Sequence, residues 1–108
     1  MTVYAVNQTR DNISDAYRYG DVKFVNIGYV YSDQLEDGRI PDESMLPIRA
    51  SAAVFEPEHD YLLIVGDHLQ LVAFVAELAL RHAYFQVLRY DRKEQAYTPV
   101  RVDCQFPA

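Results

Sequence analysis

The sequence predicts an α/β fold, and three observations support this prediction. Short segments rich in β-branched and aromatic residues alternate with segments of helical periodicity. The most apolar short segment, residues 61–65 (YLLIV), has no polar side chain on either face, which is typical of a central parallel strand. Gly66, Asp67 and His68 then interrupt the apolar run before a helical segment begins. This alternation is the pattern of parallel sheets with helical crossovers.

The first three predicted elements are a strand, a helix and a strand. Residues 3–6 (VYAV) and 22–25 (VKFV) are runs of strand-forming residues. Between them, Asn12 can cap a short helix that carries Asp15 in its first turn and ends at Gly20. These elements form one strand–helix–strand unit.

An irregular excursion and a second helix follow. Residues 27–41 show little periodicity, although the Asp-Gly pair at 37–38 signals a turn. The helix is predicted to begin at a Ser44 cap, to hold Pro47 in its tolerated first turn, and to end before Pro57. Its buried face is expected to comprise Leu46, Ala50, Ala53 and Val54.

The third helix should run from about His68 to His82, directly after the apolar strand. Asp67 can cap it, and Gln70 completes a pair that resembles a capping box. Almost all of the helix is apolar, so most of its circumference must be covered. Its one polar stripe comprises Gln70, Glu77 and Arg81.

The outer side of this helix is expected to carry Phe74 and Leu78 beside the polar stripe. A second copy of the chain would cover that side through a twofold interface. The alternative is that residues 27–41 fold over the helix within one chain.

The chain closes with a predicted hairpin: strands at residues 85–90 and 97–102 flank a polar turn at 91–95. With right-handed crossovers, the elements predict a small three-layer sandwich of the Rossmann-like or flavodoxin-like type. We expect one domain over residues 1–108, with about five strands in the order 2-1-3-4-5 and the last strand antiparallel.

In open sheets of this kind, ligands bind beyond the carboxyl ends of the strands, where the strand order reverses. That crevice should lie between the first and third strands. The candidate ligand-binding residues are Asn7, Gln8 and Arg10 on one side and Gly66, Asp67 and His68 on the other.

Sequence motifs assign no catalytic residue to this crevice. The loop after the first strand lacks glycine, which excludes a dinucleotide fingerprint and a P-loop. Asp67 at a helix N-terminus would compete with a phosphate for the same amides. His59 and His82 should lie at the opposite edge from His68, so we expect no metal site and no cofactor. Cys104 is expected to be an inert thiol.

Charge and hydropathy restrict the partners. The net charge is −6, and residues 31–60 account for it with eight acidic residues against two arginines. An acidic surface repels phosphate backbones, so no direct nucleic-acid binding is expected. The N-terminus shows no signal-peptide pattern, and polar residues interrupt the run at 61–80, so we expect a cytoplasmic protein without a membrane span.

A resemblance adds to this interpretation. The chain contains the segments VYAVNQ (3–8), RD (10–11), DYLLIVGD (60–67), LRYDR (88–92) and YTPV (97–100). With these segments it resembles small hypothetical proteins encoded by tailed bacteriophages, which tend to have Trp at position 90, Tyr at 98 and often Pro at 68. The resemblance implies a viral accessory protein that acts in a bacterial cytoplasm.

The leading hypothesis is therefore a non-enzymatic phage accessory protein that binds a host or phage protein, in host takeover or against host defence. A second hypothesis is a domain that binds or hydrolyses a small ligand or signalling nucleotide in the crevice. A third is an acidic mimic of nucleic acid, based on residues 31–60.

Overall fold

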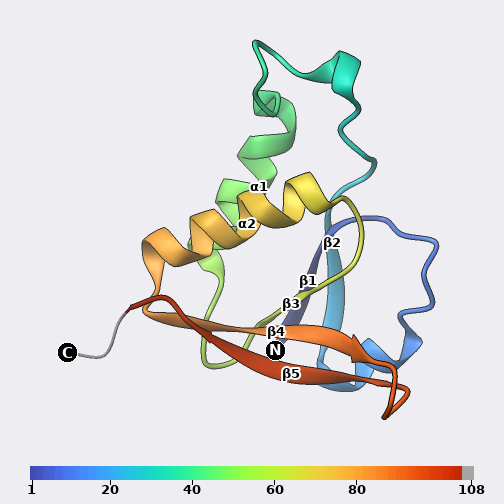
Figure 1. Cartoon of the computed structure of the whole chain (residues 1–108). Coiled ribbons are helices and arrows are strands. Elements are labelled where there is room, and N and C mark those ends of the chain that lie inside the picture. Colours follow the sequence, from blue (N-terminus) through green and yellow to red (C-terminus); the bar gives the residue numbers. More distant parts are fainter. Residues whose placement is uncertain (106–108) are drawn as a thin grey trace.

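The computed structural model describes residues 1–105 and contains one five-stranded sheet, in the order β2-β1-β3-β4-β5 (Figure 1). All neighbouring strands are parallel except β4 and β5, which form an antiparallel hairpin. The predicted strand order and directions are confirmed. The strands are β1 Thr2–Asn7, β2 Asp21–Asn26, β3 Tyr61–Leu63, β4 Tyr84–Asp91 and β5 Ala96–Asp103.

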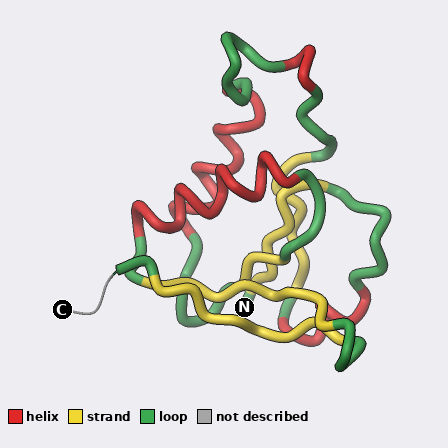
Figure 2. The backbone as a smooth tube through the Cα atoms, viewed as in Figure 1, coloured by secondary structure: helices red, strands yellow, loops and turns green. Residues whose placement is uncertain are grey.

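The handedness of the crossovers explains the layers. The connection from β1 to β2 runs one way along the sheet, whereas those from β2 to β3 and from β3 to β4 run the other way. Right-handed crossovers therefore place α1 (Asp42–Val54) and α2 (His68–Arg81) on one face and η1 (Ser14–Tyr19) on the opposite face. Figures 1 and 2 show the two long helices together above the sheet, so the sandwich is uneven.

Two apolar clusters fill the spaces between these layers. The cluster under α1 and α2 centres on Tyr4, Phe55 and Phe74, whose ring centroids lie 5.5–6.3 Å apart. The cluster on the other face is smaller, because a short 3₁₀ helix covers less of the sheet than two α-helices do. Its buried members are Val3, Ala5, Ala16, Leu63, Val65, Leu88 and Tyr97.

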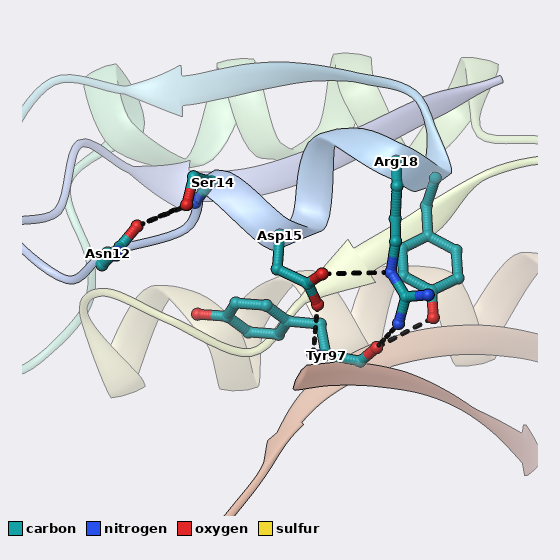
Figure 3. A network of polar contacts seen from close by, with 6 residues as sticks. Asn12, Ser14, Asp15, Arg18 and Tyr97 are labelled. Carbon is teal, nitrogen blue, oxygen red and sulfur yellow. Dashed lines mark hydrogen bonds and ion pairs between the residues drawn. The ribbon is translucent and has the colours of Figure 1, made fainter. Parts of the chain in front are cut away.

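The short helix η1 is bound to the far edge strand by side chains (Figure 3). Asp15 accepts a hydrogen bond from the Tyr97 amide at 2.7 Å, and Arg18 donates to the Tyr97 carbonyl at 2.9 Å. Asp15 and Arg18 also form an ion pair at 3.2 Å. The predicted Asn12 cap is replaced by a local turn, in which its side chain accepts hydrogen bonds from the amide and hydroxyl of Ser14.

The predicted buried face of α1 is wrong. Leu46, Ala50, Ala53 and Val54 are exposed, and the helix instead buries a face that includes Ile48, Ser51 and Ala52. The helix begins at Asp42, two residues before the predicted Ser44 cap.

The predicted outer side of α2 is also wrong. Phe74 and Leu78 are fully buried in the core and cannot form the interface expected of them. Gln70, expected in an exposed polar stripe, is buried as well. Between the two ends of this helix, the exposed side chains are instead apolar, with Val72 67% and Leu80 79% exposed. Because nearly all residues of α2 are apolar, the sequence pattern does not indicate which side of the helix faces the core.

Residues 27–41 form a projecting arm that contains η2 (Ser32–Gln34) and a tight turn (Figure 1). Asp37 and Gly38 both have positive φ, 53° and 73°, and the flanking residues 36 and 39 form an antiparallel bridge, so the predicted turn is confirmed. The arm contacts the N-terminus of α2, where the Val30 amide donates to the Asp67 cap and the Gly28 carbonyl accepts from Gln70, but it leaves Val72 and Leu80 exposed.

Candidate functional site

A cavity of about 720 Å³ opens at the carboxyl ends of β1 and β3, where the strand order reverses. Its volume falls within the range of roughly 300–1,000 Å³ that is usual for small-molecule sites. It forms between three connections: the loop after β1, the loop after β2, and the turn from β3 into α2. The lining residues are Asn7, Gln8, Thr9, Arg10, Asp11, Gly28, Tyr29, Tyr31, Ile64, Val65, Gly66 and His68.

One hydrogen bond holds two of these connections together at the base of the cavity. The buried Asn7 side chain accepts a hydrogen bond from the Asp67 amide at 2.8 Å and donates to the Gln8 carbonyl at 3.0 Å. Gly66 has a φ of 87°, and a Cβ there would collide with the Asn7 side-chain oxygen. Glycine is therefore required for this close approach.

The Asp67 carboxylate is turned into the protein. One oxygen accepts from the Leu69 amide at 3.0 Å, which caps α2 as predicted. The other accepts from the Val30 amide at 2.8 Å and from the Gln70 side chain at 3.0 Å. Burial alone would raise the pKa of Asp67, but these hydrogen bonds outweigh it and lower the pKa below its usual value.

Gln70 extends this network to the arm and to α1. Its amide nitrogen donates to the Gly28 carbonyl at 2.9 Å, and its oxygen accepts from the Asn26 side chain at 2.8 Å. Asn26 also donates to the Ser44 carbonyl of α1 at 3.0 Å. Gln70 thus contacts the Asp67 side chain and not the cap backbone, so the two do not form a capping box.

The groups available to a ligand lie above this base. Tyr29 and Tyr31 are 53% and 64% exposed, and their rings lie side by side with centroids 6.2 Å apart and planes inclined by 32°. Arg10 and His68 are exposed and have no ion-pair or hydrogen-bond partner within residues 1–105. The cavity therefore combines aromatic faces with unpaired basic side chains.

A second cavity of about 380 Å³ shares three lining residues with the first. Asp11, Ile64 and Val65 belong to both, and Tyr90 and Tyr97 extend the lining towards the β4–β5 hairpin. Tyr90 is half-exposed there, and its ring meets Tyr97 edge-on at 5.4 Å. The crevice thus runs along the carboxyl edge of the sheet.

The structure brings together the six candidate residues predicted from sequence. Five of them line the main cavity, whereas Asp67 supports it from within and presents no carboxylate to a ligand. Sequence reasoning missed Tyr29 and Tyr31, because they lie in the excursion at 27–41 that showed no regular pattern. Two tyrosines so close to the end of a predicted strand were the only signal.

Metal-binding and thiol chemistry find little support among the described residues. Within residues 1–105, no group of three or more His, Cys, Asp and Glu side chains is arranged to hold a metal ion. Burial raises the pKa of the partly buried Cys104 thiol, and nearby Asp103 adds to this effect. A raised pKa disfavours the reactive thiolate. In the same residues, no helix is long and apolar enough to cross a membrane.

Comparison with known proteins agrees with the resemblance seen in the sequence. A family model described as "Phage Pam3 gp32-like protein" matches residues 1–104, which is nearly the whole chain. No curated protein and no solved structure matches the chain.

Proposed function

Because the chain belongs to the phage Pam3 gp32-like protein family, we propose that it is a phage accessory protein. We further propose that it binds a small ligand in its crevice. One observation supports the ligand-binding proposal: the cavity of about 720 Å³ lies where the strand order reverses, and exposed basic and aromatic side chains line it. The protein would act in the cytoplasm of the infected host, by withdrawing or sensing that ligand.

The rigid base of the cavity supports this proposal. Asn7, Gly66 and Asp67 fix the two central connections relative to each other through buried contacts. A preformed site loses less conformational entropy on binding than a site that must be ordered by its ligand. The exposed side chains of the cavity can therefore adjust to a ligand while the base of the cavity keeps its shape.

The test is a thermal-shift screen of the full chain against small metabolites, followed by NMR on any compound that stabilises it. A ligand present at 100 times its Kd should add about 2.7 kcal/mol to the free energy of unfolding. We expect its chemical-shift changes to centre on the amides of Gln8, Gly66 and His68. Stabilising compounds that shift only amides distant from the crevice would contradict the proposal.

The outer surface of α2 favours a second candidate function, binding of a host or phage protein. Glu77 pairs with Arg81 at 2.8 Å and lies 3.9 Å from Arg49 of α1, so this charged residue faces the neighbouring helix. Apart from His68 and Arg81 at its two ends, the exposed residues of α2 are apolar: Leu69, Val72, Ala76, Ala79 and Leu80. Exposed apolar patches of this kind are typical of protein interfaces. The partner would present a complementary apolar surface.

Affinity capture from infected-cell lysate with matched variants tests this candidate. A partner should be retained by the wild type and by a Lys93→Glu control in the β4–β5 turn, and lost with Val72→Glu. Retention of the partner by all three proteins would rule out the α2 surface.

The hypothesis of an acidic nucleic-acid mimic is weaker, because the acidic residues are spread over the arm, α1 and the loop before β3. One of them, Asp60, is buried.

A further inference from the structure

The two sides of the cavity differ in chemistry, and this difference identifies a class of ligand. The loop after β2 contributes two tyrosine rings, which together form an exposed aromatic platform. The loop after β1 contributes Gln8, Thr9 and Arg10, which offer hydrogen-bonding groups and a permanent positive charge. Ile64, half-exposed, gives the floor an apolar surface between them.

The aromatic side suits a flat heterocycle. The two rings are inclined by 32° with centroids 6.2 Å apart, which is too close to admit a further ring between them. A base would therefore stack on their exposed faces, as bases stack on aromatic side chains in many nucleic-acid-binding proteins.

The basic side suits one anionic group. A guanidinium binds a phosphate through paired charge-assisted hydrogen bonds, and Arg10 has no ion-pair partner within residues 1–105. His68 lines the same cavity. The N-terminus of α2 is not the phosphate site, because the Asp67 carboxylate already accepts the Leu69 amide there.

The surrounding charge limits how many phosphates the site can hold. Asp11 lines the cavity beside Arg10, and the arm that contributes the tyrosines also carries Asp33, Glu36 and Asp37. On a chain of net charge −6, each additional phosphate would add repulsion that a single arginine cannot offset. Polynucleotides and nucleoside triphosphates are thereby disfavoured.

From this arrangement we infer that the crevice binds a nucleoside monophosphate, with its base on Tyr29 and Tyr31 and its phosphate at Arg10. This inference rests on the proposed ligand-binding function and names the ligand class. The ribose would then lie over the floor of the cavity, near Ile64 and Gly66.

Calorimetric titration of the full chain with the four ribonucleoside 5′-monophosphates tests the inference. The same titrations are run with the matching nucleosides, the triphosphates, inorganic phosphate and a single-stranded oligonucleotide. At least one monophosphate should bind, more tightly than its nucleoside and its triphosphate. Failure of all four to bind, or tighter binding of the triphosphate or oligonucleotide, overturns the inference.

Variants assign the two halves of the ligand. Arg10→Ala should raise the Kd of the monophosphate roughly tenfold, equivalent to about 1.4 kcal/mol, while leaving nucleoside binding unchanged. Tyr29→Ala should weaken both ligands. The matched controls are Arg92→Ala in the β4–β5 turn and Tyr17→Ala on η1, both exposed and outside the cavity, and neither should change binding. Equal losses in Arg10→Ala and Arg92→Ala would overturn the inference.

NMR separates failure of this inference from failure of the proposed function. A sugar phosphate or aromatic acid that shifts the amides of Gln8, Gly66 and His68, when no monophosphate does, would overturn the ligand class and leave the crevice as a ligand site. Circular dichroism of each variant establishes that its fold is intact before its Kd is interpreted.

Discussion

At the scale of single residues, Asp67 joins the arm to the first turn of α2 with one carboxylate. It caps α2 at Leu69, fixes the arm at Val30 and receives the side chain of Gln70. The cap was predictable from the sequence, because an acidic residue before an apolar helix is a local signal. The contact with Val30 was not, since it joins residues 37 positions apart through an irregular segment.

The structure changes what is expected of Asp67→Asn. From the cap alone, asparagine should be a mild replacement because it can still accept the helix amide. However, its amide nitrogen would face donors from Val30 or Leu69, whichever way it is turned. We predict that Asp67→Asn lowers the free energy of unfolding by about 1–3 kcal/mol, close to the cost of Asp67→Ala. Urea denaturation measures this, and an Asn variant as stable as the wild type would refute it.

The lowered pKa of Asp67 predicts how this contribution depends on pH. A carboxyl group with a lower pKa in the folded state stabilises the fold above its ordinary value of 3.8 and loses that effect as pH falls through the folded pKa. The stability difference between wild type and Asp67→Ala should be constant near pH 7 and shrink below about pH 4. Urea midpoints of both proteins at several pH values test this; a difference that grows in acid would contradict it.

Two glycines of the crevice provide a matched pair. Gly66→Ala introduces a Cβ that collides with Asn7 at a φ of 87°, so it should cost more than about 1 kcal/mol. Gly28→Ala meets no atom within 4 Å and should stay within about 0.5 kcal/mol of the wild type. Thermal unfolding compares them. Equal costs would mean that the Asn7–Gly66 approach does not constrain the crevice.

At the scale of elements, the sequence predicted strand order well and helix orientation poorly. The order follows from a buried apolar strand, alternating elements and right-handed crossovers, which local patterns reveal. On α2, by contrast, Leu, Val and Ala occupy nearly every direction. Gln70 lies inside, where Asn26, Gly28 and Asp67 form hydrogen bonds with its side chain. A buried polar residue whose partners come from other elements reverses the apparent orientation of such a helix.

The attachment of η1 to β5 is an element-scale feature that sequence patterns did not indicate. In the edge strand β5, the Tyr97 amide points away from β4 and donates to Asp15. Pro99, two residues further along, has its nitrogen on the same outer edge but has no N–H to donate. Together, the η1 contact and the proline protect this edge from pairing with another chain.

We predict that Asp15→Ala lowers the free energy of unfolding by about 1 kcal/mol and accelerates hydrogen exchange at the Tyr97 amide. The carboxylate is that amide's partner at 2.7 Å. Glu58→Ala, an exposed acidic residue in the loop before β3, is the control and should change neither quantity. Unaltered exchange at Tyr97 in Asp15→Ala would show that η1 does not protect the edge.

At the scale of the whole molecule, both helices lie on one face and their outermost side chains are largely apolar. Leu46 and Val54 of α1 and Val72 and Leu80 of α2 are all more than half exposed. The Glu77 side chain, in contrast, is largely buried between the helices, 3.9 Å from the half-exposed Arg49. A surface of this composition favours association with another apolar surface. A second copy of the chain would supply one, as an alternative to the host or phage protein proposed above.

We therefore predict concentration-dependent self-association through α2, with residues different from those expected from the sequence. Val72→Glu with Leu80→Glu places charges on the exposed face and should give a folded monomer. Phe74→Glu, which would bury a charge in the core, should unfold the protein instead of dissociating it. Light scattering with circular dichroism distinguishes these outcomes. A wild-type protein that stays monomeric at several hundred micromolar would rule out self-association through this face, and a folded Phe74→Glu variant would contradict the orientation of α2.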